Sequence, residues 1–299
     1  MSPFSTRTFG KWILSGEHTV LRGGEALVFP LKSQWLDWKF IPDQNAGSLN
    51  VVIPQGYPEE FKLLFYSVFE KACILSHAQN HQFYGSLEMR AQILVGSGLG
   101  ASATLCVALT RWFQEMGLVG SGDAFSFAKQ LEDVFHGESS GVDVAVVLSE
   151  SGLIYKRNEQ PVSFKPQYQP EWYLSHSGEK GITKECVNKV KALEAKDPKK
   201  FNSIDQQMMQ VTKLCKEALE SNSMKSSLQL QLALDMGREC FEQWGLVTPA
   251  LKQHMDLLQN HGAIAMKPTG SGGGGFVLSL WDSMPKPLDG VTFLKASVN

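Results

Sequence analysis

A glycine run in the middle of the chain could hold a phosphate group. Glycines at alternate positions let backbone amides converge on an anion without obstruction by Cβ atoms, and the helix-forming segment that follows would point its positive N-terminal end at that anion. A plain turn is the alternative interpretation. The spacing fits neither the dinucleotide fingerprint nor a Walker loop, because no Gly-Lys-Ser/Thr follows. The run reads Val95-Gly96-Ser97-Gly98-Leu99-Gly100-Ala101-Ser102-Ala103.

Two acidic residues further along are candidates for metal binding and proton transfer. Glu132 falls at the C-terminal end of a predicted helix, where a carboxylate opposes the helix dipole unless a cation such as Mg²⁺ compensates. Asp143 enters the apolar run 142–148, a costly place for an unpaired carboxylate, and it is therefore a candidate catalytic base. A turn aspartate that caps backbone amides is the alternative.

The N-terminal segment carries a lysine and a polar turn that could act together. Lys11 begins an apolar strand-like segment that ends in Gly16-Glu17-His18. Lys11 would bring positive charge to a phosphate or a reacting hydroxyl, and the Glu-His pair would hydrogen-bond a polar substrate. A solvated lysine and a surface turn are the plain alternatives. A second glycine run, at 270–275, indicates close backbone approach to another element or to a ligand.

The elements that must position these residues alternate in type and predict an α+β protein. Strands are predicted from β-branched and aromatic content between turn residues, at 11–14, 26–31, 35–40, 87–95, 142–148, 152–156, 172–176, 263–267 and 275–280. Helices are predicted from apolar residues at helical spacing, at 58–77, 103–113, 123–135, 183–195, 205–220, 226–244 and 248–259. Thr248 is the predicted N-cap of the last helix, with Pro249 at its first position.

Composition excludes several classes of protein. The 299 residues are 43% hydrophobic and 19% charged, which is typical of a globular protein of one large or two smaller domains. A net charge of -2 provides no general field for nucleic acid or an anionic membrane, so neither is an expected partner. Without a signal-peptide core or a bilayer-length apolar segment, a cytoplasmic location is expected. The five scattered cysteines are expected to be reduced and mostly buried.

Four motifs in order resemble those of the GHMP kinase superfamily, within which the mevalonate kinases are most similar. They are Gly-Lys…Gly-Glu-His at 10–18, Gly-Leu-Gly-Ala-Ser-Ala at 98–103, Glu…His-Gly…Ser-Gly-Val-Asp at 132–143 and Lys-Pro-Thr-Gly-Ser-Gly-Gly-Gly-Gly at 267–275. The resemblance implies the two-domain GHMP kinase fold of the α+β class. An N-terminal ATP-binding domain with a left-handed βαβ unit is expected at 1–165, and a ferredoxin-like C-terminal domain at 166–299.

The resemblance also implies ATP-dependent phosphorylation of a small-molecule hydroxyl, with mevalonate as the first candidate. Asp143 would take or orient the proton of that hydroxyl, and Lys11 would stabilise the charge that develops during transfer. Ser102 and Glu132 would hold Mg²⁺. The implied phosphate-binding residues are Gly96, Ser97, Gly98, Leu99, Gly100, Ala101 and Ser102. The implied substrate-binding residues are Glu17, His18, Thr269 and Gly270.

Departures from the family pattern leave alternatives open. Ala101 replaces the first serine of a pair, so Ser102 is the single hydroxyl at the start of the helix. Lys267-Pro268 resembles phosphomevalonate kinase, but the extra phosphate on that substrate would need more basic residues than the few arginines supply. Another GHMP kinase activity, or a non-catalytic ligand-binding relative, is a further alternative. The expected partners are ATP and a small hydroxy acid, and the expected state is a monomer or a homodimer.

Overall fold

The computed structural model describes residues 2–298 except 54–58, 80–81, 94–95, 97, 137–138, 222 and 224. It divides into two compact units, and each unit contains separate stretches of the chain. Unit 1 is made of Met1–Lys11, Lys32–Val95 and Leu99–Glu150. Unit 2 is made of Trp12–Leu31, Gly96–Gly98 and Ser151–Asn299. The two compact units do not coincide with continuous stretches of the chain. The family domains at 1–165 and 166–299 therefore stay a prediction.

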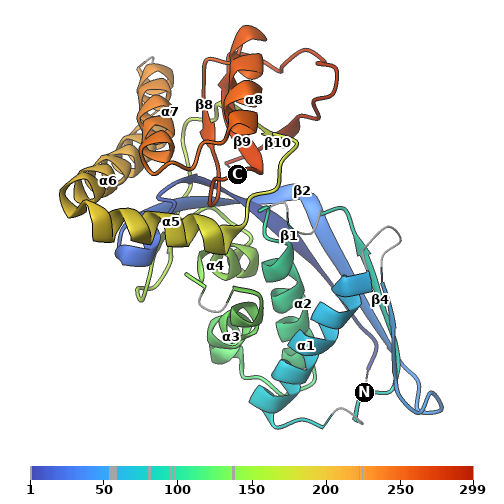
Figure 1. Ribbon diagram of the computed structural model, residues 1–299. Helices are drawn as coiled ribbons and strands as arrows, with labels where there is room; N and C mark the ends of the chain where they lie inside the picture. Colours follow the sequence, from blue (N-terminus) through green and yellow to red (C-terminus); the bar gives the residue numbers. More distant parts are fainter. Residues whose placement is uncertain are drawn as a thin grey trace. The chain divides into compact units, whose positions relative to one another are not determined.

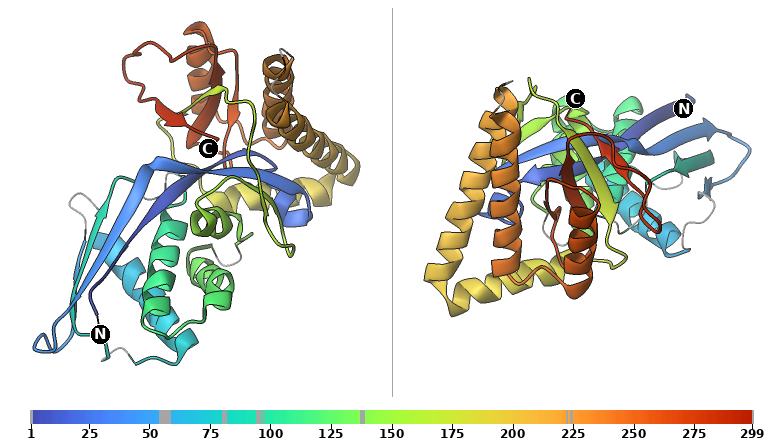
Figure 2. Two further views of the ribbon diagram at one scale, coloured as in Figure 1. Left: turned by 180° about the vertical axis from the view of Figure 1, so that it is seen from behind. Right: turned by 90° about the horizontal axis from the view of Figure 1, so that it is seen from above.

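Unit 1 is a sheet with helices on one face (Figures 1 and 2). Within it, β2 pairs antiparallel with β4, and β4 pairs parallel with β3. Because β3 and β4 are parallel neighbours joined through α1, they form the expected βαβ unit. The elements that lie wholly or partly in this unit are β1 (Phe4–Ser15), β2 (Glu25–Pro42), β3 (Leu49–Val52), α1 (Glu59–Ser76), β4 (Gly85–Ala91), α2 (Ala101–Glu115), η3 (Ser121–Asp123), α3 (Ala124–His136) and α4 (Val142–Ser149).

An aromatic core fixes α2, the helix that follows the predicted phosphate loop. Alternate residues of β2, among them Trp38 and Phe40, are buried toward the helices, as expected for a strand with one covered face. Trp112 of α2 lies 4.7 Å from Phe40 and 5.6 Å from Trp38, measured between ring centroids. Helices α1 and α3 contribute Phe65, Val68, Phe69, Phe127 and Leu131 to the same core.

The prediction of a strand at 142–148 is wrong, because these residues form helix α4. Its β-branched residues favour a strand, but a short apolar run buried on most sides has no periodicity that separates strand from helix. Val144 and Val147 pack with residues of α2 and α3 in one core cluster. Gly141 begins the helix with φ 82°, a left-handed conformation that glycine adopts without strain. Asp143 therefore lies in the first turn of a helix, where a carboxylate interacts favourably with the dipole.

Unit 2 contains a four-stranded antiparallel sheet in the order β10-β7-β9-β8. Numbered along the chain, this is the order 4-1-3-2 of a ferredoxin-like sheet, as the family resemblance predicts. Residues 282–293, all of them described, contain no helix between the last two strands. The strands of this unit besides parts of β1 and β2 are β5 (Leu153–Lys156), β6 (Val162–Ser163), β7 (Glu171–His176), β8 (Ala265–Pro268), β9 (Phe276–Trp281) and β10 (Leu294–Ala296).

Among the described helices of unit 2, the first was not predicted and the others correspond to predicted helices. They are η1 (Thr19–Arg22), α5 (Thr183–Lys196), α6 (Pro198–Glu220), α7 (Ser226–Gln243) and α8 (Pro249–Asn260). Figure 1 shows α6 and α7 side by side. The predicted N-cap of α8 is confirmed, because Thr248 Oγ1 accepts a hydrogen bond of 3.2 Å from Leu251 N. Helix α6 begins seven residues before the predicted start, where Asp197 caps it by accepting from Lys200 N.

Two expectations from composition can be compared with the structure. All five cysteines are free and buried, which confirms the prediction of reduced, buried thiols. In the part of the chain that the structure describes, none of the helices combines the length and the apolar character needed to span a bilayer.

Candidate active site

Lys11 and Asp143 form an ion pair in unit 1. Lys11 Nζ lies 3.0 Å from Asp143 Oδ2, although the two residues are far apart in the sequence. The lysine side chain is 5% exposed and the aspartate side chain 24% exposed. The ammonium group is therefore held inside the unit, while the carboxylate keeps a face that a substrate can reach. The structure thus brings together the two residues predicted to be catalytic.

The glycine loop holds Lys11 through its backbone and through a close approach. Lys11 N donates a hydrogen bond of 2.8 Å to Leu99 O. Gly100, the N-cap of α2, has φ 87°, and a Cβ on it would lie 2.9 Å from Lys11 Cγ. Any larger residue would be strained by the backbone conformation and would also push the lysine side chain. Gly100 therefore sets the position of Lys11 as well as the start of the helix.

The start of α2 is suited to binding an anion. Its first turn contains Ala101 and Ser102 and no acidic residue. The N-terminal backbone amides of a helix carry partial positive charge that favours phosphate. Gly96 and Gly98 have φ of 74° and 80°, and a Cβ on either would meet no atom within 4 Å. Ser97, predicted as a phosphate-binding residue, lies outside the described residues.

Glu132 of α3 is a buried carboxylate beside the Lys11–Asp143 pair. Desolvation, followed by the nearby Asp143 carboxylate, raises the pKa of Glu132 to about 8, while Lys11 and Ser139 oppose the rise. A divalent cation bound beside Glu132 would favour its ionised form, because the cation would offset desolvation and the repulsion by Asp143. Carboxylate and hydroxyl oxygens are ligands that Mg²⁺ accepts. The residues around Glu132 therefore fit the predicted metal, with Ser102 as the candidate hydroxyl ligand.

Unit 2 contains a second ion pair, and it is sealed from solvent. Lys267 Nζ contacts Glu17 Oε1 with side chains that are 0% and 1% exposed. The ammonium group also donates to Pro268 O at 2.9 Å and lies 5.3 Å from the centroid of the Phe241 ring. A Cβ on Gly237 would lie 2.9 Å from Lys267 Cδ, so α7 leaves room for the lysine stem. Glu17, predicted to contact substrate, is thus engaged by a lysine.

His18 is buried in unit 2 in a strained conformation. Its φ is 61°, a left-handed value that is uncommon for residues other than glycine. His18 Nε2 lies 2.9 Å from Ser271 O, and the ring lies 5.0 Å from that of Trp244. Burial lowers the pKa of His18 to about 4, so the ring is neutral at pH 7. Strain of this kind is often found at functional sites.

The late glycine run packs mainly against protein. Thr269 Oγ1 donates a hydrogen bond of 2.7 Å to Ile13 O. A Cβ on Gly272 would lie 2.9 Å from both Leu246 Cβ and Phe241 Cδ1, so close packing against another element explains this glycine. Gly270, predicted to contact substrate, has φ 82° and open space where a Cβ would lie. Within the run, Gly270 is therefore the candidate for backbone contact with a ligand.

The sequence analysis did not predict the partner of Glu17. The sequence pattern relates Lys267 only to the phosphomevalonate kinases. A signal was nevertheless present, because Lys267 interrupts the apolar run of a strand that is buried at every position. A lysine in such a place needs a buried acidic partner.

A family model matches part of this chain. Residues 64–151 match the GHMP kinases N terminal domain. This segment of the chain is thus similar to the N-terminal domain of GHMP kinases. This match covers α2, α3 and α4, the helices that present Ser102, Glu132 and Asp143. The resemblance to the GHMP kinase superfamily is thereby confirmed.

Full-length similarity extends over both units. The mevalonate kinase of Thermococcus onnurineus (strain NA1) is 25% identical over 292 residues, which cover 90% of this chain and 86% of that protein. The mevalonate kinase of L. major in complex with R-mevalonate has a TM-score of 0.78 at 21% identity, over 94% of this chain and 87% of that chain. A Streptococcus pneumoniae phosphomevalonate kinase has a TM-score of 0.74 at 16% identity, over 94% and 93%. These structures show that the fold is the GHMP kinase fold.

Proposed function

We propose that this chain transfers the γ-phosphoryl group of ATP to the hydroxyl of a small hydroxy acid, with mevalonate as the first candidate. The observation that carries the proposal is the Lys11–Asp143 pair of 3.0 Å next to the glycine that begins α2. Phosphoryl transfer requires positioning and charge stabilisation above all, and a carboxylate in hydrogen-bond reach of the acceptor suffices as base. The similarity to mevalonate kinases supports this choice of acceptor.

In the proposed reaction, the oxygen of the acceptor hydroxyl attacks the γ-phosphorus of ATP. Asp143 accepts the proton of that hydroxyl. Lys11, next to Asp143, stabilises negative charge on the transferring oxygens. The start of α2 binds the phosphates through backbone amides. Because Lys11 is only 5% exposed, water competes weakly for its charge, which strengthens each of these interactions.

Glu132 and Ser102 are the residues that would hold Mg²⁺ when ATP binds. The metal would neutralise charge on the β- and γ-phosphates. Its arrival beside Glu132 would also favour the ionised carboxylate, whose pKa is otherwise raised to about 8 by burial and by Asp143. Binding of Mg²⁺ should therefore release a proton when the pH lies below that value.

Charge pairing in unit 2 supports an unphosphorylated acceptor over phosphomevalonate. Lys267 is fully buried against Glu17. Arg22 donates two hydrogen bonds of 2.6 and 2.7 Å to the carboxylate of Asp205. Both cations, which lie in the unit that contains His18 and Thr269, are thus already matched by acids. The phosphate that phosphomevalonate already carries would require cations that are free to bind it.

The test is turnover of ATP with a panel of acceptors. ADP release would be measured in a coupled assay with mevalonate, phosphomevalonate, homoserine and galactose, each with Mg²⁺. We expect the highest kcat/KM with mevalonate. Preference for phosphomevalonate would overturn the choice of acceptor but would leave the proposed kinase activity standing. Absence of turnover with all four, together with measurable ATP binding by calorimetry, would favour a non-catalytic ligand-binding protein.

A further inference from the structure

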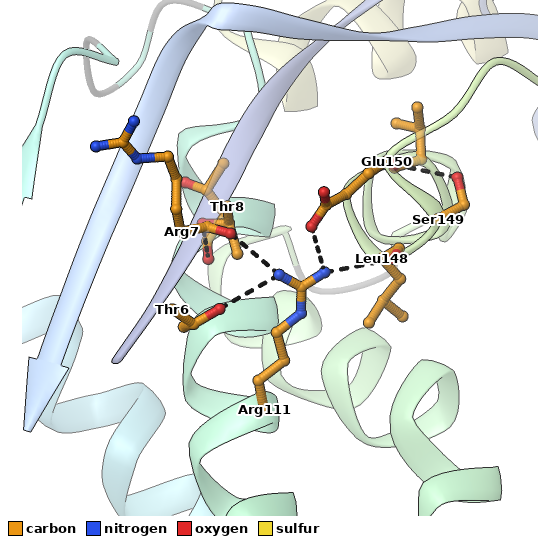
Figure 3. A network of polar contacts seen from close by, with 9 residues as sticks. Thr6, Arg7, Thr8, Arg111, Leu148, Ser149 and Glu150 are labelled. Carbon is orange, nitrogen blue, oxygen red and sulfur yellow. Dashed lines mark hydrogen bonds and ion pairs between the residues drawn. The ribbon is translucent and has the colours of Figure 1, made fainter. Parts of the chain in front are cut away.

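Arg111 joins three elements of unit 1 at one point (Figure 3). It projects from the third turn of α2, and its Nη1 donates to Thr6 Oγ1 at 3.3 Å and to Arg7 O at 3.1 Å, both on β1. Its Nη2 donates to Glu150 Oε1 at 2.8 Å and lies 3.5 Å from Leu148 O, at the end of α4. One side chain therefore connects α2, β1 and the C-terminal end of α4.

The same three elements carry the candidate active site at their other ends. β1 presents Lys11, four residues after Arg7, and α2 begins at the glycine loop. Helix α4 presents Asp143 in its first turn and ends at Ser149, next to the Arg111 contacts. About one and a half turns of helix separate Asp143 from Leu148, about 8 Å along the axis. A small displacement of the far end of α4 would therefore move the Asp143 carboxylate.

Helix α4 depends on this contact more than a longer helix would. It has eight residues, and its N-cap, Gly141, has no side chain to accept from the first turn. Ser140 Oγ accepts from Val142 N at 3.3 Å, and Ser149 Oγ donates to Val146 O at 3.3 Å. Leu148 O is among the last four carbonyls, which lack partners within the helix, and a guanidinium group there also interacts favourably with the helix dipole. At the other end, the Asp143 side chain is held by its ion pair with Lys11. That pair must open when Lys11 and Asp143 engage a substrate, whereas the Arg111 contact can persist.

We propose that Arg111 is a positioning residue for Asp143: it holds α4 in place while the Lys11–Asp143 pair is open. The inference rests on the proposed kinase function for its kinetic test. Arg111 touches no reacting atom in this scheme and acts through the orientation of α4. Glu150 completes the contact by accepting from the guanidinium group. The other ties between β1 and α2, such as Thr8 Oγ1 donating to Thr104 O, do not involve α4.

The experiment compares Arg111→Met with Arg7→Met. Both remove a guanidinium group from unit 1, but the Arg7 side chain points away from Arg111 and pairs with Asp37 (Figure 3). We expect Arg111→Met to lower kcat at least about tenfold, because small misplacements of catalytic groups have effects of this size. The KM for ATP should change less than about twofold, since α2 keeps its loop. Arg7→Met should leave kcat unchanged, and Glu150→Gln should give an intermediate loss.

A coupling measurement separates positioning from general destabilisation. In an Asp143→Asn background, Arg111→Met should lower the residual rate by less than about twofold, because the group that it orients is already disabled. A purely structural role would give the same loss in both backgrounds. Arg111→Lys should restore part of the rate, since it keeps the charge but not the forked geometry. The fraction of folded protein, measured by circular dichroism, normalises every rate.

Hydrogen exchange provides a readout that does not require activity. Amides of residues 144–149 should exchange at least about tenfold faster in Arg111→Met than in Arg7→Met if Arg111 holds α4. Equal exchange and equal kcat in the two variants would overturn the inference. If the wild-type protein turns over no acceptor, only the proposed function is overturned. The difference in hydrogen exchange between Arg111→Met and Arg7→Met would still test whether Arg111 holds α4.

Discussion

Two lysine–carboxylate pairs of this chain have a buried lysine, and they differ in access to solvent. Asp143, which pairs with Lys11 in unit 1, keeps 24% of its side chain exposed. The Glu17–Lys267 pair of unit 2 is 1% and 0% exposed. Each lysine lies against a glycine whose Cβ would come within 2.9 Å of the lysine stem, Gly100 in one case and Gly237 in the other. The local construction is similar, and only one of the pairs has a face that a reactant can reach.

We propose that this difference separates a catalytic pair from a structural one. A catalytic carboxylate must exchange its partner for a substrate, so it needs access and a pair that can open. A sealed pair cannot open without exposing unpaired charges to a medium of low dielectric constant. We therefore assign the reactive role to Lys11 and Asp143. Glu17 and Lys267 are instead proposed to hold the turns that carry His18 and Thr269.

Replacing the open pair should have the largest effect on activity. Asp143→Asn removes the proton acceptor but keeps the shape of the side chain, so kcat should fall about 10²–10⁴-fold. ATP affinity, measured by calorimetry, should change little, because the start of α2 is intact. The free energy of unfolding should change by less than about 1 kcal/mol. A variant with more than a tenth of wild-type kcat would show that Asp143 is not the base.

Replacing one partner of the sealed pair should have the largest effect on stability. Lys267→Met leaves the Glu17 carboxylate buried without its cation, and the free energy of unfolding should fall by about 3–5 kcal/mol in urea titrations. The double variant Glu17→Gln with Lys267→Met should recover most of this loss. Lys252→Met, which breaks an exposed pair with Asp256, is the matched control and should cost less than about 1 kcal/mol. Equal losses in the two lysine variants would contradict the assigned difference.

The two regions should also give opposite dependences of stability on pH. In unit 1, the pKa of Glu132 is raised from 4.5 to about 8, so the folded state retains a proton that the unfolded state has lost. Stability then falls as the pH rises from about 4.5 to 8, by at most about 1.4 kcal/mol per unit. In unit 2, the pKa of His18 is lowered from 6.5 to about 4, so stability falls as the pH drops through that range.

Between pH 4.5 and 6.5 the effects of Glu132 and His18 on stability have opposite signs. Above pH 6.5 only the effect of Glu132 is expected. Urea titrations of the metal-free protein in EDTA should show wild type losing stability between pH 6.5 and 8, whereas Glu132→Gln should be flat there. His18→Asn should remove the loss at acidic pH, because asparagine does not titrate in this range. A wild-type curve as flat as that of Glu132→Gln above pH 6.5 would contradict the buried environment of Glu132.

The smallest expected effects come from the two glycines. Gly100→Ala places a Cβ against Lys11 in a backbone with φ 87°, which should cost about 1–2 kcal/mol and lower kcat as the lysine moves. Gly237→Ala lies inside α7, where the gain in helix propensity of about 1 kcal/mol offsets part of the clash with Lys267. Its kcat should stay within about twofold of wild type. A larger loss of kcat in Gly237→Ala than in Gly100→Ala would reverse the roles of the two lysines.

Local signals accounted for much of the predicted fold. The cap at Thr248 was predictable because the donor and the acceptor lie three residues apart. Strands β7 and β9 were predictable from short apolar runs between turn residues. Helix α4 was not, because its β-branched composition favours a strand and only its burial against α2 and α3 decides the outcome. Position in the tertiary structure thus overrides propensity in that segment.

The candidate site, too, could be predicted only in part from the sequence. Motif order identified Lys11 and Asp143, and the structure places them in contact. Their catalytic roles, the metal ligands and the substrate contacts stay predictions. The Lys267 partner of Glu17 could not be predicted from local sequence, because the two residues are 250 positions apart. Such a pairing depends on how strands meet in space, which composition and spacing do not specify.

The burial of all five cysteines has a practical consequence for spectroscopy. Burial raises the pKa of Cys106, Cys215 and Cys240, which suppresses the thiolate form that reacts with maleimides and with oxidants. Cys73 and Cys186 are buried as well, with raised pKa values. A single cysteine introduced at an exposed position should therefore accept a fluorophore or spin label selectively in the native protein. Distances between labelled elements could then be followed in solution without first removing the native thiols.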